Sequence, residues 1–261
     1  MCLMSMLALA SCEKELDFDY HDIEPLTVIE AGLTPDGLMA AITLTTPMDD
    51  PMNRTRLTDA SMTLTDLTTG TVRSGVPDAD GYFRDVAPGV PGHTYRLTVK
   101  RGDAVYAAET AMYASVTIES LEFSWIKMPY DHVAVLQGKF ACAPGATGQC
   151  YWIKLYRNGE IYRWAAMDDR GATSGVCTFT VFTTRRDTSE EDDDTVLRDG
   201  DVVTCTVSTV SRPMHDYLEA LQNGSNGPAM YTGARCLGYF MATSPVSRSI
   251  VFHPDQIPGY E

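Results

Sequence analysis

Residues 91–99 read PGHTYRLTV, and this stretch decides the fold class. The opening Pro-Gly pair is a turn signal, and Tyr95, Leu97 and Val99 then alternate with polar residues. Alternation places these three side chains on one face of an extended chain. The stretch therefore predicts a half-buried β-strand that begins directly after a turn.

The same pattern recurs along the chain, with turn residues about every eight to twelve positions, which is typical of a sandwich or a barrel. Strands are expected in the N-terminal part at 26–31, 39–45, 61–66, 71–74, 81–86, 94–100 and 105–112. Strands are expected in the C-terminal part at 115–125, 132–141, 151–157, 160–166, 177–183, 201–210, 237–243 and 246–252. The predicted fold is mainly β: an N-terminal immunoglobulin-like β-sandwich over 25–113, then a second β-rich sandwich or barrel-like domain over 114–261 with one short helix.

The one helical pattern lies at 213–222, PMHDYLEALQ. Met214, Tyr217, Leu218 and Leu221 repeat at the spacing that forms one apolar stripe on a helix. The leading proline suits a first turn, and the Asn-Gly pair that follows the stretch ends it.

Composition excludes several classes of partner. The 261 residues include 20 Lys and Arg against 35 Asp and Glu, so the formal net charge is −15. A chain this acidic is unsuited to nucleic acid, which selects basic surfaces, and to electrostatic adsorption on anionic lipid. At ~100–200 residues per domain, the length allows one large domain or two small ones.

The N-terminus indicates a location. Residues 1–11, MCLMSMLALAS, are uncharged and too short to span a bilayer, which takes ~20 apolar residues. The sequence Leu-Ala-Ser-Cys at 9–12 resembles the lipobox of bacterial lipoproteins, which implies lipidation of Cys12 and removal of 1–11. The absence of Lys and Arg before the apolar run suggests a start codon farther upstream. The alternative is a buried N-terminal element that contains a free cysteine.

The residues after Cys12 are acidic and form an expected flexible tether over 12–24. Glu13-Lys14-Glu15 and the acids that follow resemble the signals that send Bacteroidota lipoproteins to the outer face of the outer membrane. The alternative is a simple solvated tether. The expected location is the outer membrane, lipid-anchored and exposed on the cell surface.

Cysteine usage predicts one disulfide. Two of the seven cysteines lie at or before the lipidated position, which leaves five, an odd number. Cys142 and Cys150 flank the loop APGATGQ between two expected strands, so a disulfide between them is expected to close the hairpin. Cys177 and Cys205 alternate with apolar residues and are expected in a core.

No catalytic motif is present, so no enzyme activity, no cofactor and no metal site are predicted. Three short motifs have simpler alternatives: 78–81 as a tight turn rather than a calcium loop, 190–194 as a solvated acidic loop, and 101–103 as a hairpin tip rather than an integrin ligand. The histidines are scattered without metal-ligand spacing, at His21, His93, His132, His215 and His253.

The hairpin over 151–166 contains the strongest candidate for a binding surface. Its Asn-Gly pair predicts a two-residue turn that fixes the register. That register places Trp152, Lys154, Tyr156 and Arg163 on one face, with the lysine opposite the arginine. Two aromatics beside two cations suit a patch for a protein partner or a platform for a sugar. The alternative is contact with the first domain or with the helix.

Five segments occur in a fixed order along the chain: CEKEL at 12–16, PGHTYRLTV at 91–99, Asp-Gly-Asp at 199–201, YLEAL at 217–221 and CLGYF at 236–240. With these segments in this order, the chain resembles the Bacteroidota lipoproteins grouped as domain of unknown function 4249.

The family has no assigned activity, so it supplies no site residue. Its members often accompany TonB-dependent outer-membrane receptors. The resemblance therefore implies a non-catalytic envelope lipoprotein that assists or docks onto such a receptor, and the alternative is a surface glycan-binding or adhesion module.

Overall fold

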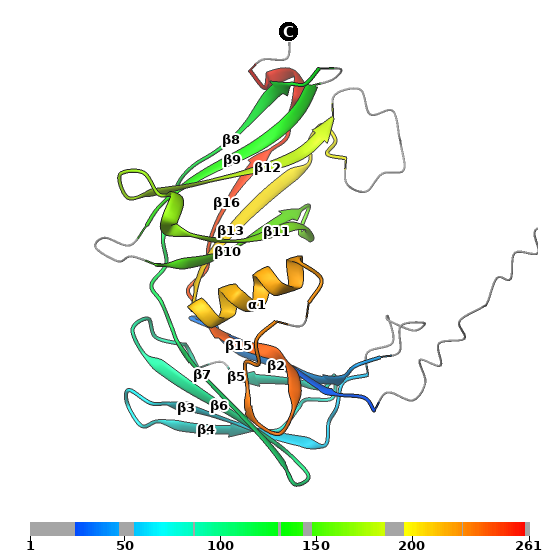
Figure 1. Ribbon diagram of the computed structural model, residues 1–261, viewed down its shortest axis with the longest axis vertical. Helices are drawn as coiled ribbons and strands as arrows, with labels where there is room; N and C mark the ends of the chain where they lie inside the picture. Colours follow the sequence, from blue (N-terminus) through cyan, green and yellow to red (C-terminus); the bar gives the residue numbers. More distant parts are fainter. Residues whose placement is uncertain are drawn as a thin grey trace, which may run out of the picture.

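The computed structural model describes residues 24–46, 55–85, 87–129, 132–142, 148–185, 196–225 and 227–258. The predicted signal segment at 1–11, Cys12, nearly all of the predicted tether at 12–24 and the acidic run at 190–194 lie outside these residues. The described chain is mainly β with one α-helix, which confirms the predicted fold class (Figure 1). Among the described residues, no helix has the length and apolar character needed to cross a membrane.

The N-terminal part is a two-sheet sandwich. One sheet contains β1, β2 and β5 as neighbours in that order, and the other contains β4, β3, β6 and β7. This division of seven antiparallel strands is immunoglobulin-like, as predicted. The strands are β1 (Thr27–Thr34), β2 (Gly37–Leu44), β3 (Ala60–Asp66), β4 (Val72–Gly75), β5 (Tyr82–Asp85), β6 (Thr94–Arg101) and β7 (Ala104–Ala111).

The stretch at 91–99 provides β6, and its alternating side chains face the core as predicted. Leu97 and Val99 are fully buried and Tyr95 nearly so. They pack in one cluster with Ile29 and Ile42 from the facing sheet. The period-two pattern therefore fixes which side of β6 the core occupies.

The second sandwich repeats the same division of strands. One sheet has the order β12-β9-β8 and the other β11-β10-β13-β16. Its own core includes Phe140, Tyr151 and Val207. The strands are β8 (Thr117–Lys127), β9 (His132–Ala141), β10 (Cys150–Arg157), β11 (Glu160–Asp168), β12 (Val176–Arg185), β13 (Val202–Val210) and β16 (Val246–Val251), with short 3-10 turns η2 (Asp169–Gly171) and η3 (Pro254–Gln256).

Between β13 and β16 the chain leaves the second sandwich and returns to the first. Residues 211–245, here called the return segment, form α1 (Arg212–Gln222), β14 (Thr232–Gly233) and β15 (Cys236–Ala242). β15 pairs in parallel with β1, and β14 pairs with β7. The predicted boundary groups these residues with the second domain, whereas their strands extend both sheets of the first.

The helix α1 lies between the two sandwiches (Figure 1). Ser211 caps its N-terminus by accepting a hydrogen bond from the backbone N–H of Met214 at 3.3 Å. Met214 and Leu218 are buried and pack beside Val210, with Trp152 and other half-buried side chains around them. The predicted helix is confirmed. Three of the four predicted stripe residues, Met214, Tyr217 and Leu218, are buried against the outer face of β10 and β11, whereas Leu221 is 42% exposed.

The second sandwich is closed on one side and open on the other. On the closed side, the guanidinium of Arg248 in β16 donates to the backbone carbonyls of Ile118 and Glu119 in β8. On the open side lie β11 and β12, each of which pairs with a single strand in the described part of the chain.

Candidate functional site

A β-bulge divides the predicted binding patch. The Asn158-Gly159 turn forms as expected, with positive φ at both residues, and Tyr156 lies opposite Ile161. The register then shifts by one residue, so Lys154 lies opposite Trp164 and not opposite the predicted Arg163. The sequence-based register was wrong beyond this point because a bulge adds one residue to one strand only.

The shift sends the four patch residues to two different faces. Trp152, Lys154 and Tyr156 share the outer face of β10, while Arg163, opposite Leu155, takes the inner face of β11. The ring of Trp152 meets the ring of Trp164 edge-on, with 6.3 Å between centroids, and that of Tyr239 at 6.2 Å. The patch is therefore no continuous surface, and Trp152 contacts the return segment.

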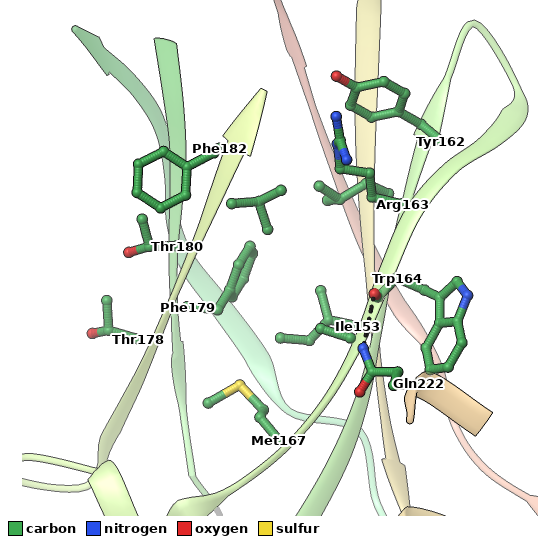
Figure 2. Close-up of a pocket in the computed structure, with 13 residues that line it drawn as sticks. Ile153, Tyr162, Arg163, Trp164, Met167, Thr178, Phe179, Thr180, Phe182 and Gln222 are labelled. Carbon is green, nitrogen blue, oxygen red and sulfur yellow. Dashed lines mark hydrogen bonds between the residues drawn. The ribbon is translucent and has the colours of Figure 1, made fainter. Parts of the chain in front are cut away.

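A groove of about 850 Å³ lies between β11 and β12 on the open side of the second sandwich (Figure 2). We call it the edge groove. Apolar side chains form its inner part: Ile153, Leu155, Met167, Phe179 and Val181. At its outer edge Phe182 is 57% exposed, an uncommon state for a phenylalanine.

Tyr162 and Arg163 of β11 are polar residues of the edge groove, which Thr178, Thr180 and Gln222 also line. The bulged Tyr162 donates its hydroxyl to the carbonyl of Thr183 at 3.5 Å, which links the two strands. Arg163 lies with its guanidinium 4.9 Å from the centre of the Tyr162 ring. Arg163 is the one charged side chain among the described lining residues, and its buried Nε makes no hydrogen bond to a described residue.

A second cavity, of about 450 Å³, lies between the two sandwiches. We call it the inter-sandwich cavity. Its floor is the outer face of β15, β1, β2 and β5, where Glu30 is the one charged lining residue, and β10 contributes Trp152 and Lys154. The ammonium of Lys154 lies 4.2 Å from the centre of the Trp152 ring. Burial lowers the pKa of Lys154, since it disfavours the charged form.

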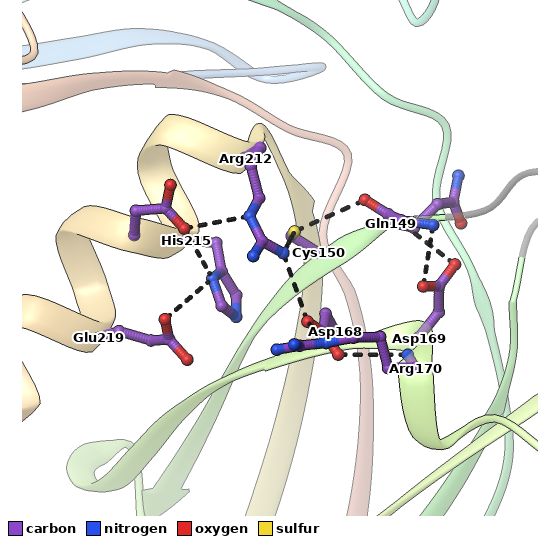
Figure 3. Close-up of polar contacts among 10 residues, drawn as sticks. Gln149, Cys150, Asp168, Asp169, Arg170, Arg212, His215 and Glu219 are labelled. Carbon is purple, nitrogen blue, oxygen red and sulfur yellow. Dashed lines mark hydrogen bonds and ion pairs between the residues drawn. The ribbon is translucent and has the colours of Figure 1, made fainter.

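A polar cluster joins α1 to the end of the β10–β11 hairpin (Figure 3). Asp168 accepts from the backbone N–H of Arg170 at 3.2 Å, from its Nε at 2.6 Å and from Nη1 of Arg212 at 3.3 Å. Burial alone would raise the pKa of Asp168, but these hydrogen bonds and charges hold it below its usual value. The carboxylate is therefore a fixed anchor for the helix.

The disulfide joins Cys142 to Cys177, with 6.2 Å between their α-carbons, and not to Cys150 as predicted. Cys142 directly follows β9 and Cys177 lies in β12, the strand that pairs with β9, so neighbouring strands bring these two cysteines together.

Cys150 is free and buried. Burial raises the pKa of its thiol, although Arg212 donates to the sulfur at 3.7 Å. A protonated thiol is a poor nucleophile.

One group on α1 could hold a cation. His215, Asp216 and Glu219 place donor atoms within 4.8 Å of one another. The His215 ring is buried, and its Nδ1 lies 3.4 Å from Asp216 and 3.6 Å from Glu219. Arg212 already pairs with Asp216 at 3.1 Å and would compete with a metal. The spacing of the histidines gave no signal for this group, because only one of its members is a histidine.

The short motifs take turn conformations. Asp78 accepts from the backbone N–H groups of Asp80 and Tyr82, both at 2.9 Å, which makes 78–81 the predicted tight turn. Arg101 pairs with Asp59 at 2.9 Å beside the β6–β7 hairpin tip. Arg84 pairs with Asp78, and Arg56 donates to the backbone carbonyl of Asp80 at 3.4 Å, so the side chains beside this turn are basic.

Sequence reasoning missed Glu30, Tyr239 and Phe182 as site residues. Glu30 offered a signal, because it is the one charged residue in the strand TVIEAGLT. The other two gave none, since an aromatic in a strand is ordinary.

Comparisons with known proteins give one family and several distant structures. A family model described as "Domain of unknown function (DUF4249)" matches residues 13–248. No curated protein matches the chain.

Three solved structures illustrate the distant likeness. A two-domain fibronectin type III segment of chicken tenascin is 10% identical, with coverage of 88% of this chain and 100% of that one and a TM-score of 0.26. The BSP domain of a biofilm-associated protein is 16% identical, covering 70% and 27%, with a TM-score of 0.25. The FN1–FN3 domains of chicken CNTN1 are 8% identical, covering 88% and 65%, with a TM-score of 0.24.

Proposed function

The chain belongs to the DUF4249 family, and on that premise we propose that it is a non-catalytic envelope lipoprotein, anchored to the outer membrane through Cys12, that docks onto a TonB-dependent receptor. The anchor follows from the lipobox-like residues at 9–12. The net charge of −15 disfavours nucleic acid and anionic lipid as alternative partners.

The edge groove is the observation that carries the docking role. It is apolar inside, and Phe182 at its outer edge is 57% exposed. Exposed apolar side chains beside a groove are typical of a protein-binding surface. The flanking strands β11 and β12 also keep one unpaired edge each within the described residues, so an extended segment can add to either sheet.

The groove also selects the chemistry of the docked segment. Its inner part takes aliphatic or aromatic side chains, and Arg163 is the charged group within it. An acidic residue in the receptor segment would pair with Arg163 and neutralise a half-buried cation. The segment we expect is extended and apolar, with one carboxylate.

The test is a pull-down of the tagged, lipidated full chain from outer membranes in mild detergent, read by mass spectrometry. We expect one TonB-dependent barrel in stoichiometric amount. The variant Phe182→Asp should lose that barrel, and Arg163→Met should weaken its capture. Val72→Asp is the matched control, since Val72 on β4 is 59% exposed and lies in the other sandwich. Capture of no barrel, or equal capture by Phe182→Asp, contradicts the proposal.

A further inference from the structure

The inter-sandwich cavity contains two opposite charges that do not pair. Among the described residues, neither the ammonium of Lys154 nor the carboxylate of Glu30 forms an ion pair, with each other or with any other group. Both residues are half-buried. Burying a charge without a partner costs free energy, so charged side chains removed from water are normally paired.

The strand register fixes the two charges on opposite walls. Glu30 lies in a row across the floor, with Tyr239 on one side and Ala41, then Tyr82, on the other. The small Ala41 leaves space beside the carboxylate. Lys154 comes from β10 of the second sandwich, which forms the facing wall. The empty space therefore separates an anion from a cation.

Aromatic rings complete the walls. Trp152 lies beneath the ammonium of Lys154, and Tyr82 and Tyr239 flank Glu30 along the floor. Met39 and Met241 add flexible apolar surface. The volume, about 450 Å³, falls within the range of ~300–1,000 Å³ of small-molecule sites. The cavity thus offers one anchor for a carboxylate, one for a cation and apolar walls between them.

We propose that the inter-sandwich cavity binds a zwitterionic small molecule of the α-amino acid class, with its carboxylate toward Lys154 and its ammonium toward Glu30. A ligand with only a negative charge would be repelled by the carboxylate of Glu30. A ligand with only a positive charge would be repelled by the ammonium of Lys154. Only a ligand with both charges compensates both side chains. A neutral sugar would leave both charges without a counter-ion. The inference rests on a different cavity from the docking groove and is independent of it.

A ligand series on the wild-type full chain tests the charges without any substitution. Trp152, one of three tryptophans, lines the cavity, so its fluorescence reports occupancy. Each L-amino acid is titrated, and the tightest is compared with its N-acetyl and amide derivatives. We expect saturable binding that weakens at least about tenfold for each derivative, since each lacks one charge. No saturable signal up to about 10 mM for any amino acid, or equal affinity for either derivative, overturns the proposal.

Two shape-conserving variants assign the anchors. Lys154→Met should weaken the binding of the amino acid at least about tenfold, and the amino acid should then bind no more tightly than its amide. In Glu30→Gln, the amino acid should bind no more tightly than its N-acetyl derivative. Lys100→Met and Glu122→Gln, both at exposed positions on other strands, are the matched controls. Near-wild-type affinity in either cavity variant, with the fold verified by near-UV circular dichroism, overturns the assignment.

Discussion

Gly238 of β15 lies directly against the backbone carbonyl of Ile29 in β1, its register partner. A β-carbon at position 238 would overlap that carbonyl, and the glycine has a φ of +99°. Both facts require glycine here. This contact lets the return segment pair with the first sandwich, and thereby joins the two sandwiches through backbone hydrogen bonds.

The variant Gly238→Ala should destabilise the chain by about 3 kcal/mol, because it adds a clash to a strained backbone conformation. Urea unfolding measures the loss. Gly32→Ala in the adjacent β1 is the control, since its β-carbon would meet only Met241 at an ordinary 3.7 Å. We expect the control within about 1 kcal/mol of wild type. Equal midpoints for both variants would contradict the role of Gly238.

Loss of the Cys142–Cys177 disulfide should lower the free energy of unfolding by about 3–4 kcal/mol, as expected for cysteines 35 residues apart. The variant Cys142→Ala in thermal unfolding checks this. Cys150→Ala removes the other half of the sequence-based pair and should leave the disulfide intact. Peptide mapping without reduction distinguishes the two pairings: a peptide that links Cys142 to Cys150 would contradict the pairing of Cys142 with Cys177.

The hydrogen bonds of the buried Asp201 make the free energy of unfolding depend on pH. Asp201 accepts from Arg157 at 2.7 Å, from Asn158 at 2.8 Å and from the backbone of Arg198 at 2.7 Å. Burial opposes the charge, but these donors hold the pKa of Asp201 below its usual value. Because the folded-state pKa is the lower one, its stabilisation is complete at neutral pH. It is lost as the pH falls below about 4 and through the folded-state pKa.

The variant Asp201→Asn should therefore be less stable than wild type by about 2 kcal/mol at pH 7, with a smaller difference at pH 3. Urea unfolding at the two pH values measures both differences. Asp103→Asn, at an exposed hairpin tip, should change little at either pH. A difference between Asp201→Asn and wild type that does not shrink in acid would rule out the carboxylate as its source.

Lys154→Met should stabilise the ligand-free chain by about 1 kcal/mol, because it removes a half-buried, unpaired ammonium. The methionine keeps a favourable contact with the ring of Trp152. Thermal unfolding without added ligand measures the gain, and Lys100→Met should stay within about 0.5 kcal/mol of wild type. A clear loss of stability in Lys154→Met would mean that the contact of the ammonium with the Trp152 ring outweighs the cost of burying the charge.

Local patterns in the sequence determined most of the secondary structure. The alternation at 94–100 placed Tyr95, Leu97 and Val99 in the core because a strand has a period of two, whatever its neighbours are. The apolar stripe at 213–222 predicted α1 for the same kind of reason, since side chains three and four apart share a face of a helix. These properties depend on residues close together in the chain.

Tertiary structure decided the rest. The extra residue at Tyr162 separated Arg163 from Lys154, and strand pairing selected Cys177 over Cys150 as the partner of Cys142. Pairing of β15 with β1 joins residues about two hundred positions apart. It places Glu30 opposite Lys154 across one cavity. No local pattern encodes these contacts between distant residues. They depend on which sheet edge each strand pairs with and on how the two sandwiches then pack.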